Sequence, residues 1–600
     1  MAERGGKVDG RALGYALAVA IGMFLSLSAA SYARIEVNAA GVDQVEPFTS
    51  WFPDNAVAAF VLVAVIACAL GLAAYAFFTR FDRIAEKLGA WQGWHRMPLS
   101  FNGRSVILCS IAIFVLWLPI ICLMYPGILT VDTFDQLYEY QTTAPTLYAT
   151  SGILVDAEMI DHHPWFDTLL YGWFWQMGYA LGSQELGIFI YAVVQCIVLA
   201  GCLGASVCYL ERLKVPYALR MAALVFCALF PFIPHYAVTI LKDSTQLMFF
   251  LPWLMLWLEA ARTRGAMLDR KGPYVAFFLL GGMCILTKKT GLMMVAACVL
   301  ILFVVMRGRR MKVALGGIAC LVVFSVALPA AASAAVGGIA PGGRQEALGP
   351  AFQQITALIR EDPSALTDEE MEAVAAVLDV DSAVSRFESF RADGAKNQFI
   401  PDASNEDVGR FMGVWLAAGL RHPDVYLHAT ATTTGLLYIP FMKLTSFADG
   451  GYTGRAWQYS GLGTGFAVEM GRPEGLQDAV HWLMHESPES AFSDLPVISL
   501  FFTTGFYGGW IPFLSVASIL YARKRRRKTG PQDDKNARER GPGGRPMFLV
   551  GIAPVIVLFA LLFICPVASP RYILPFLFGC PLILGWVWFA LSSRSETASR

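Results

Sequence analysis

The sequence predicts an all-α polytopic membrane protein of about twelve transmembrane helices, with interfacial helices in the first outer loop and a small, mainly helical extracytoplasmic insert. Three observations support this fold class. Of the 600 residues, 56% are hydrophobic and only 15% are charged. The mean hydropathy of +0.53 indicates more apolar surface than a soluble chain can bury. Long apolar runs recur along the chain, with basic residues concentrated in alternate loops between them.

Twelve apolar runs are long enough, alone or shielded by neighbouring helices, to cross about 30 Å of hydrocarbon. They span residues 12–31, 55–78, 105–124, 185–209, 217–234, 245–261, 273–287, 291–307, 313–335, 498–521, 547–567 and 572–591. The first run also resembles a secretory signal peptide. The second run follows so soon that a retained helical hairpin is the better interpretation.

Basic residues in the short loops predict the orientation, because Lys and Arg are enriched on the cytoplasmic side. The clusters that we assign to this side are Arg80, Arg83, Lys87, Arg96 and Arg104; Arg212, Lys214 and Arg220; Arg262, Arg264, Arg270 and Lys271; Arg307, Arg309, Arg310 and Lys312; and the run from Arg523 to Lys528. Both termini are then cytoplasmic. Residues 165–181 would break this alternation by crossing, so we expect an interfacial helix there. Residues 426–441 are short, and parity favours a re-entrant or paired arrangement.

The apolar runs divide the chain into four parts. These are an N-terminal hairpin with its cytoplasmic loop (1–104), a membrane core with the first outer loop at 125–184 (105–335), an extracytoplasmic insert with further loops (336–497), and the C-terminal helices with a basic cytoplasmic loop (498–600). Residues 337–410 carry 6 basic and 14 acidic side chains, so we expect neither nucleic acid nor anionic lipid as a partner of the insert. Within the insert, Thr367 and Glu370 form a capping box in a helical stretch.

The first outer loop opens with two carboxylates at the membrane boundary. Asp132 follows Pro126-Gly127 directly after an apolar run, and Asp135 comes three residues later. A carboxylate just outside the hydrocarbon can have a shifted pKa and act as a general base, so both are catalytic candidates. The simpler alternative is that Asp132 caps a juxtamembrane helix, with Asp135 on its solvated first turn.

The same loop closes with Asp161-His162-His163-Pro164. Histidines beside an aspartate suit proton transfer or metal binding, which makes His163 the third catalytic candidate; the alternative is a helix cap at headgroup depth. No metal ligand is assigned. His481 and His485 share a helical face but lack the HExxH order and a third ligand. The loop is compatible with a metal-free mechanism or with a single divalent ion.

Four basic residues fall on the predicted outer side, against the usual charge bias. They are Lys242, Lys288, Lys289 and Arg571. Cationic groups at headgroup depth suit a phosphate or pyrophosphate, and the Arg571 guanidinium can bind such a group through two parallel hydrogen bonds. The alternative is that these side chains extend to lipid headgroups.

The ordered motifs resemble those of the GT-C class of polytopic membrane glycosyltransferases. They are PGxxxxD (126–132), HHP (162–164), LKDS (241–244), TKKTGL (287–292) and SPRYILP (569–575), and the similarity spans roughly residues 105–590. The chain is most similar to an uncharacterised bacterial branch of that class with PG-D-Q, HP, KD, RKNG-like and RY-P signatures. Here Lys288-Lys289-Thr290-Gly291 replaces Arg-Lys-Asn-Gly, and two helices precede residue 105, unlike the simplest pattern of the class.

The resemblance implies a sugar donor linked to a polyprenyl phosphate and an extracytoplasmic acceptor, which is a cell-envelope glycan, lipid or protein. It also implies inverting transfer with Asp132 as base and Asp135 as second candidate. His163 matches the HP element, Lys289 the RKNG-like turn and Arg571 the RY element. The expected partners are the lipid-linked donor, the acceptor and membrane lipid.

Two other functions remain open from the sequence. A lipid or solute transporter is expected to carry ionisable residues within its helices and to show inverted repeats, whereas the apolar runs here are nearly free of charge. The second is a non-enzymatic scaffold or an envelope polysaccharide polymerase or ligase, since polymerases also use Arg and His in outer loops.

Overall fold

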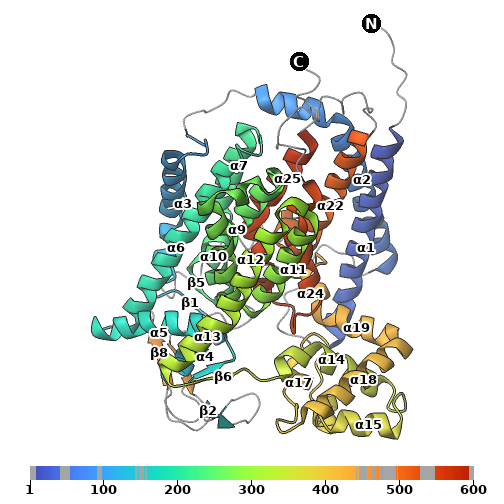
Figure 1. Ribbon diagram of the computed structural model, residues 1–600. Coiled ribbons are helices and arrows are strands. Elements are labelled where there is room, and N and C mark those ends of the chain that lie inside the picture. Colours follow the sequence, from blue (N-terminus) through green and yellow to red (C-terminus); the bar gives the residue numbers. More distant parts are fainter. Residues whose placement is uncertain are drawn as a thin grey trace.

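The computed structural model describes residues 9–40, 55–90, 97–141, 146–147, 154–155, 159–440, 442, 444, 456–460, 467–471, 475, 495, 498–527 and 547–592. Within these residues, long helices stand side by side in a bundle, and a smaller group of helices lies at one end of it (Figure 1).

All twelve predicted runs lie in helical segments. The corresponding helices are α1 (Gly10–Ala40), α2 (Ala56–Ala90), α3 (Gly103–Leu123), α6 (Gln184–Tyr209), α7 (Tyr217–Leu229) with α8 (Phe232–Val238), α9 (Lys242–Arg262), α10 (Lys271–Thr287), α11 (Lys289–Val305), α12 (Arg310–Val322) with α13 (Leu328–Val336), α22 (Ile511–Arg527), α23 (Phe548–Gly551) with α24 (Ala553–Leu562), and α25 (Leu574–Ser592). Six described helical segments are long and apolar enough to cross a membrane, or seven if α7 and α8 count as one. The chain is therefore a helical membrane protein, and the full count of twelve crossings stays a prediction.

Several of the remaining helices are short because the chain breaks at polar or proline residues. α7 and α8 meet at an angle of 51°, where Pro231 precedes α8. α10 and α11 have 17 residues each and are separated by the extended residue Lys288. As predicted, Lys288 and Lys289 therefore lie at a turn between two apolar helices.

α9 and α25 occupy the centre of the bundle. α9 packs against α6, α10 and α25, and almost all of α25 is buried inside the protein. Lys242 is the first residue of α9, and Arg571 lies in the single helical turn before α25. A basic residue thus lies at the start of α9 and just before the start of α25.

The insert forms a separate helical group with its own hydrophobic core. Its helices are α14 (Gln345–Glu361), α15 (Asp368–Ala375), α16 (Val380–Ser385), α17 (Asp393–Lys396), α18 (Asn405–Arg421) and α19 (Pro423–Thr434). Phe352 and Phe411 are fully buried in this core. The predicted capping box at the start of α15 is confirmed, because Thr367 and Glu370 each accept the backbone N–H of the other. Figure 1 shows this group at the end of the bundle opposite to the start of α1 and the end of α25.

Two short parallel strand pairs connect loop segments at the insert end of the bundle. β1 (Ile128–Leu129) pairs with β5 (Thr239–Ile240), and β4 (Met159–Asp161) pairs with β6 (Ile339–Pro341). These strands are not predictable from the sequence, because two or three residues are too few for an alternating pattern. The remaining strand pairs are β2 (Thr146–Leu147) with β3 (Leu154–Val155), and β7 (Ala456–Ser460) with β8 (Ala467–Gly471).

Two helices of the first outer loop lie at the same end. α4 (Val131–Gln141) follows β1 directly, and α5 (Trp165–Ala180) covers the predicted interfacial segment 165–181. In Figure 1, α5 runs across the end of the bundle rather than along it. This direction agrees with an interfacial helix.

Candidate functional site

The first strand pair brings the beginnings of α4 and α9 together. Leu129 is aligned with Ile240, so Asp132 and Lys242 follow shortly after the same short ladder. Thr133 reinforces this contact by donating its hydroxyl to the carbonyl oxygen of Ile240. Residues 110 positions apart in the sequence are thereby held side by side.

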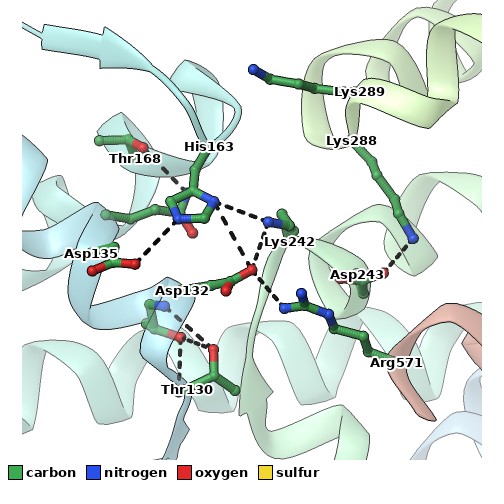
Figure 2. Close-up of polar contacts among 12 residues, drawn as sticks. Thr130, Asp132, Asp135, His163, Thr168, Lys242, Asp243, Lys288, Lys289 and Arg571 are labelled. Atoms are coloured by element: carbon green, nitrogen blue, oxygen red, sulfur yellow. Dashed lines mark hydrogen bonds and ion pairs between the residues drawn. The ribbon is translucent and has the colours of Figure 1, made fainter. Parts of the chain in front are cut away.

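Thr130, not Asp132, caps the N-terminus of α4 by binding a backbone N–H of its first turn. The Thr130 hydroxyl accepts the backbone N–H of Thr133, and the Thr133 hydroxyl accepts the N–H of Thr130. The interpretation of Asp132 as a helix cap is therefore wrong. Its carboxylate points into the bundle, toward Lys242 and Arg571 (Figure 2).

Both of these cations bind one oxygen of Asp132. Lys242 Nζ and Arg571 Nη1 each lie 2.6 Å from Asp132 Oδ2, and the three side chains are 17–20% exposed. Burial alone would raise the pKa of Asp132, but Arg571 and Lys242 outweigh it and hold this pKa well below its usual range. Asp132 is therefore ionised, and it is a weak base while both cations hold it.

His163 lies beside the same cluster. Its Nδ1 is 3.0 Å from Lys242 Nζ and its Nε2 is 3.7 Å from Asp135 Oδ2. Burial, and then the nearby Lys242, hold the pKa of His163 well below its ordinary value, so the ring is neutral. Because the Lys242 ammonium can only donate, Nδ1 is the acceptor and the ring proton sits on Nε2, facing Asp135.

Lys288 is held in a buried ion pair. Its ammonium bonds Asp243 Oδ1, and the two side chains are 9% and 1% exposed. Lys288 Nζ also lies 5.3 Å from the ring centroid of Tyr572, and the guanidinium carbon of Arg571 lies at the same distance from that ring. The Lys288–Asp243 pair thus supports Tyr572 and, through it, the neighbourhood of Arg571.

Lys289 lies apart from the cluster around Asp132 (Figure 2). Its side chain is 47% exposed, and its ammonium bonds the backbone carbonyl of Asp161, with Asp161 Oδ2 at 3.7 Å. Asp161 Oδ1 accepts the backbone N–H of Trp165 at the start of α5. Asp161 thus binds the first backbone N–H of α5, whereas His163 belongs to the ionic cluster.

Four further residues of this region were missed from the sequence: Glu139, Asp167, Asp243 and Tyr572. Glu139 is buried one helical turn after Asp135, and burial, with Asp135 nearby, raises its pKa well above the usual range. Burial does the same for Asp167, whose two carboxyl oxygens have no hydrogen-bond partner among the described residues. The spacing of four between Asp135 and Glu139 was the available signal for Glu139. Asp243 and Tyr572 adjoin residues that the sequence analysis had selected.

The described part of the chain contains no group of three or more His, Cys, Asp or Glu side chains arranged to hold a metal ion. His481 and His485 lie outside the described residues. The predicted alternatives, a metal-free mechanism or a single divalent ion, both stay predictions.

The fold and the site define a helical membrane protein with a partly buried ionic cluster at one end of its bundle. The chain belongs to a family of unknown function, DUF6020, which matches residues 12–528. The match includes Asp132, His163 and Lys242 and ends before Arg571. No curated protein and no solved structure matches the chain.

Proposed function

We propose that this protein is a membrane glycosyltransferase that transfers a sugar from a polyprenyl-phosphate donor to an extracytoplasmic acceptor. Asp132 accepts the proton of an acceptor hydroxyl, whose oxygen forms a bond to the anomeric carbon of the sugar. The bond from that carbon to the phosphate oxygen breaks, polyprenyl phosphate leaves with the electron pair, and the configuration inverts. The proposal also places the chain in the GT-C class, as the motifs suggest.

The observation that carries the proposal is the convergence of one carboxylate and two cations. Asp132 comes from the first outer loop, Lys242 from the start of α9 and Arg571 from the turn before α25, and each cation lies 2.6 Å from Asp132 Oδ2. A transferase of this kind needs a base for the acceptor and positive charge for the leaving phosphate at the same point. Residues 110 and 439 positions apart supply both.

The remaining predicted site residues have separate roles in this proposal. His163, neutral and bonded to Lys242, orients the ammonium. Lys289 is exposed enough to attract the donor phosphate from the headgroup region. Lys288 positions Tyr572 and Arg571 instead of binding phosphate itself, because its ammonium is enclosed with Asp243.

The proposal includes a topology of about twelve crossings in the cell membrane, with both termini cytoplasmic and the insert outside. It is supported by the arrangement of the two ends of the bundle. Arg11 near the start of α1 donates to the carbonyl of Lys524 at the end of α22, and Arg525 pairs with Asp82 of α2. The insert lies at the opposite end (Figure 1).

Labelling of single introduced cysteines tests this topology. An impermeant maleimide added to intact cells is expected to label a Ser364→Cys variant and to reach a Thr529→Cys variant only after permeabilisation. The unsubstituted protein, whose cysteines fall in or beside apolar runs, provides the background. Labelling of residue 529 with protection of residue 364 would reverse the orientation and move the ionic cluster to the cytoplasmic side.

The catalytic proposal is tested with the purified full chain in vesicles that contain a synthetic polyprenyl-phosphate sugar. We expect the sugar to appear covalently on an added envelope acceptor, with polyprenyl phosphate as the second product and an Asp132→Asn variant as the inactive control. Movement of the donor between leaflets without transfer would contradict the proposal and favour a transporter. Elongation of a glycan from a lipid-linked oligomer, without use of the single-sugar donor, would favour a polymerase.

A further inference from the structure

We propose that Asp132 is an internal substitute for the donor phosphate, which holds Lys242 and Arg571 until a lipid-linked phosphate displaces it. This inference rests on the proposed function and adds to it an order of binding. The donor enters first, and its phosphate releases the base that the acceptor then needs.

The contacts of Asp132 are those of a bound anion. Lys242 Nζ and Arg571 Nη1 both donate to Asp132 Oδ2 at 2.6 Å, and His163 Nδ1 lies 4.0 Å from the same oxygen. No described residue donates a hydrogen bond to Oδ1. An ammonium and a guanidinium that converge on one anionic oxygen form the arrangement that binds a phosphate oxygen.

Charge balance favours displacement of Asp132 over simple addition of the phosphate. Lys242 and Arg571 both direct their positive charge at Asp132, His163 between them and Asp135 is neutral, and Asp135 Oδ2 lies 3.7 Å from the far side of the His163 ring. A phosphate that joined these ion pairs would place its charge beside the ionised Asp132 carboxylate in a poorly solvated site, where like charges repel strongly. Displacement lessens this repulsion, because the phosphate takes over the two donors and the Asp132 carboxylate turns away from it.

The site is accessible enough for such an exchange. Asp132, Lys242 and Arg571 are 17%, 18% and 20% exposed, whereas the neighbouring Lys288 and Asp243 are 9% and 1% exposed. The first three side chains can therefore exchange partners with a ligand that arrives from the interface, while the Lys288–Asp243 pair keeps the surrounding helices in place.

Displacement would also change the chemistry of Asp132. The two cations hold its pKa well below the usual range against the opposing effect of burial. Once a phosphate takes them over, burial raises this pKa, and Asp132 becomes a stronger base. The acceptor is then deprotonated only when a donor is present.

Binding of farnesyl phosphate to the detergent-solubilised full chain tests the exchange. We expect Asp132→Asn to bind it roughly tenfold or more tightly than the wild type, because the competing carboxylate is gone. The matched control is Asp135→Asn, which removes a nearby negative charge on the other side of the His163 ring and should change affinity less than about threefold. Lys242→Gln should bind more weakly than the wild type. Asp132→Ser provides a second neutral variant if Asp132→Asn does not fold.

The outcomes separate the inference from the function on which it rests. Equal or weaker binding by both folded Asp132 variants, or equal tightening by Asp135→Asn, overturns the exchange and leaves the transferase proposal in place. Binding of inorganic phosphate but not of farnesyl phosphate overturns the lipid-linked source. If no variant binds either phosphate, the inference and the proposed function both fail. Farnesol, which lacks the phosphate, should not bind in any sample.

Discussion

The two ends of the helix bundle use the same kinds of ion pair in opposite ways. At the end of the bundle where α1 begins and α25 ends, Asp269 pairs with Arg309 at 2.7 Å and with Lys312 at 2.6 Å, 40 and 43 residues away. At the insert end, Asp132 pairs with Lys242 and Arg571 at 2.6 Å, 110 and 439 residues away. Each carboxylate thus has two cationic partners at nearly equal distances.

The two groups of ion pairs differ in their exposure to solvent. Asp269 is 42% exposed, Lys312 49% and Arg309 26%, whereas Asp132, Lys242 and Arg571 are at most 20% exposed. Exposed pairs contribute little to stability, because water and salt screen them. Removing one partner of an enclosed pair leaves a buried charge without compensation, which destabilises the fold unless another charged group takes the partner's place. The comparison indicates that distance alone does not mark a functional site, whereas burial with long-range convergence does.

The largest effect on stability is expected at Lys288. Lys288→Gln leaves the buried Asp243 carboxylate without its cation, and we expect this to lower the free energy of unfolding by about 3–5 kcal/mol. Thermal unfolding of the purified protein in detergent measures it. The double variant Lys288→Gln with Asp243→Asn should recover much of the loss, because no buried charge is then left alone. A single variant as stable as the wild type would remove the supporting role of this pair.

A smaller effect, on ligand affinity, is expected at the two cations of the site. Lys242→Gln and Arg571→Gln should each weaken binding of farnesyl phosphate roughly 10- to 150-fold, since each removes one charge-assisted contact. The loss of affinity should lie toward the lower end of this range. Each substitution also removes a contact to Asp132 in the free protein, which weakens the competition from that carboxylate. Unchanged affinity in both variants would mean that these residues serve only their ion pairs.

The smallest effect is expected at the opposite end. Asp269→Asn removes an exposed carboxylate from Arg309 and Lys312 and should cost about 1 kcal/mol or less. The same thermal unfolding assay applies. A loss as large as that of Lys288→Gln would break the distinction between the two ends.

The sequence predicted the helices better than the contacts between them. Apolar runs and the Thr367 capping box are local patterns, and the structure confirms a helix at each. Asp132, His163, Lys242 and Arg571 were selected separately, and the structure brings them together. Their pairing was not predicted, because it depends on two-residue strands and on the central positions of α9 and α25.

The individual environments of the charged residues were also beyond the sequence. Lys288 is enclosed and Lys289 is exposed, a difference that two adjacent lysines do not reveal in a sequence. A position at the membrane boundary does not reveal the direction of the pKa shift of Asp132, because burial raises this pKa and the two cations outweigh burial. Burial of Glu139 and Asp167 depends on how α4 and α5 pack, which composition does not reveal.

Turnover of Asp132→Asn beside Asp135→Asn is the most direct test of the central claim that Asp132 is the base. Sugar transfer is measured at saturating donor, with rates normalised to folded protein, so that altered affinity does not contribute. We predict that Asp132→Asn loses roughly 10²-fold or more, because the amide cannot take up the acceptor proton, while Asp135→Asn retains most of its activity. An active Asp132→Asn enzyme would contradict the account, and an inactive Asp135→Asn enzyme beside it would move the base by one helical turn.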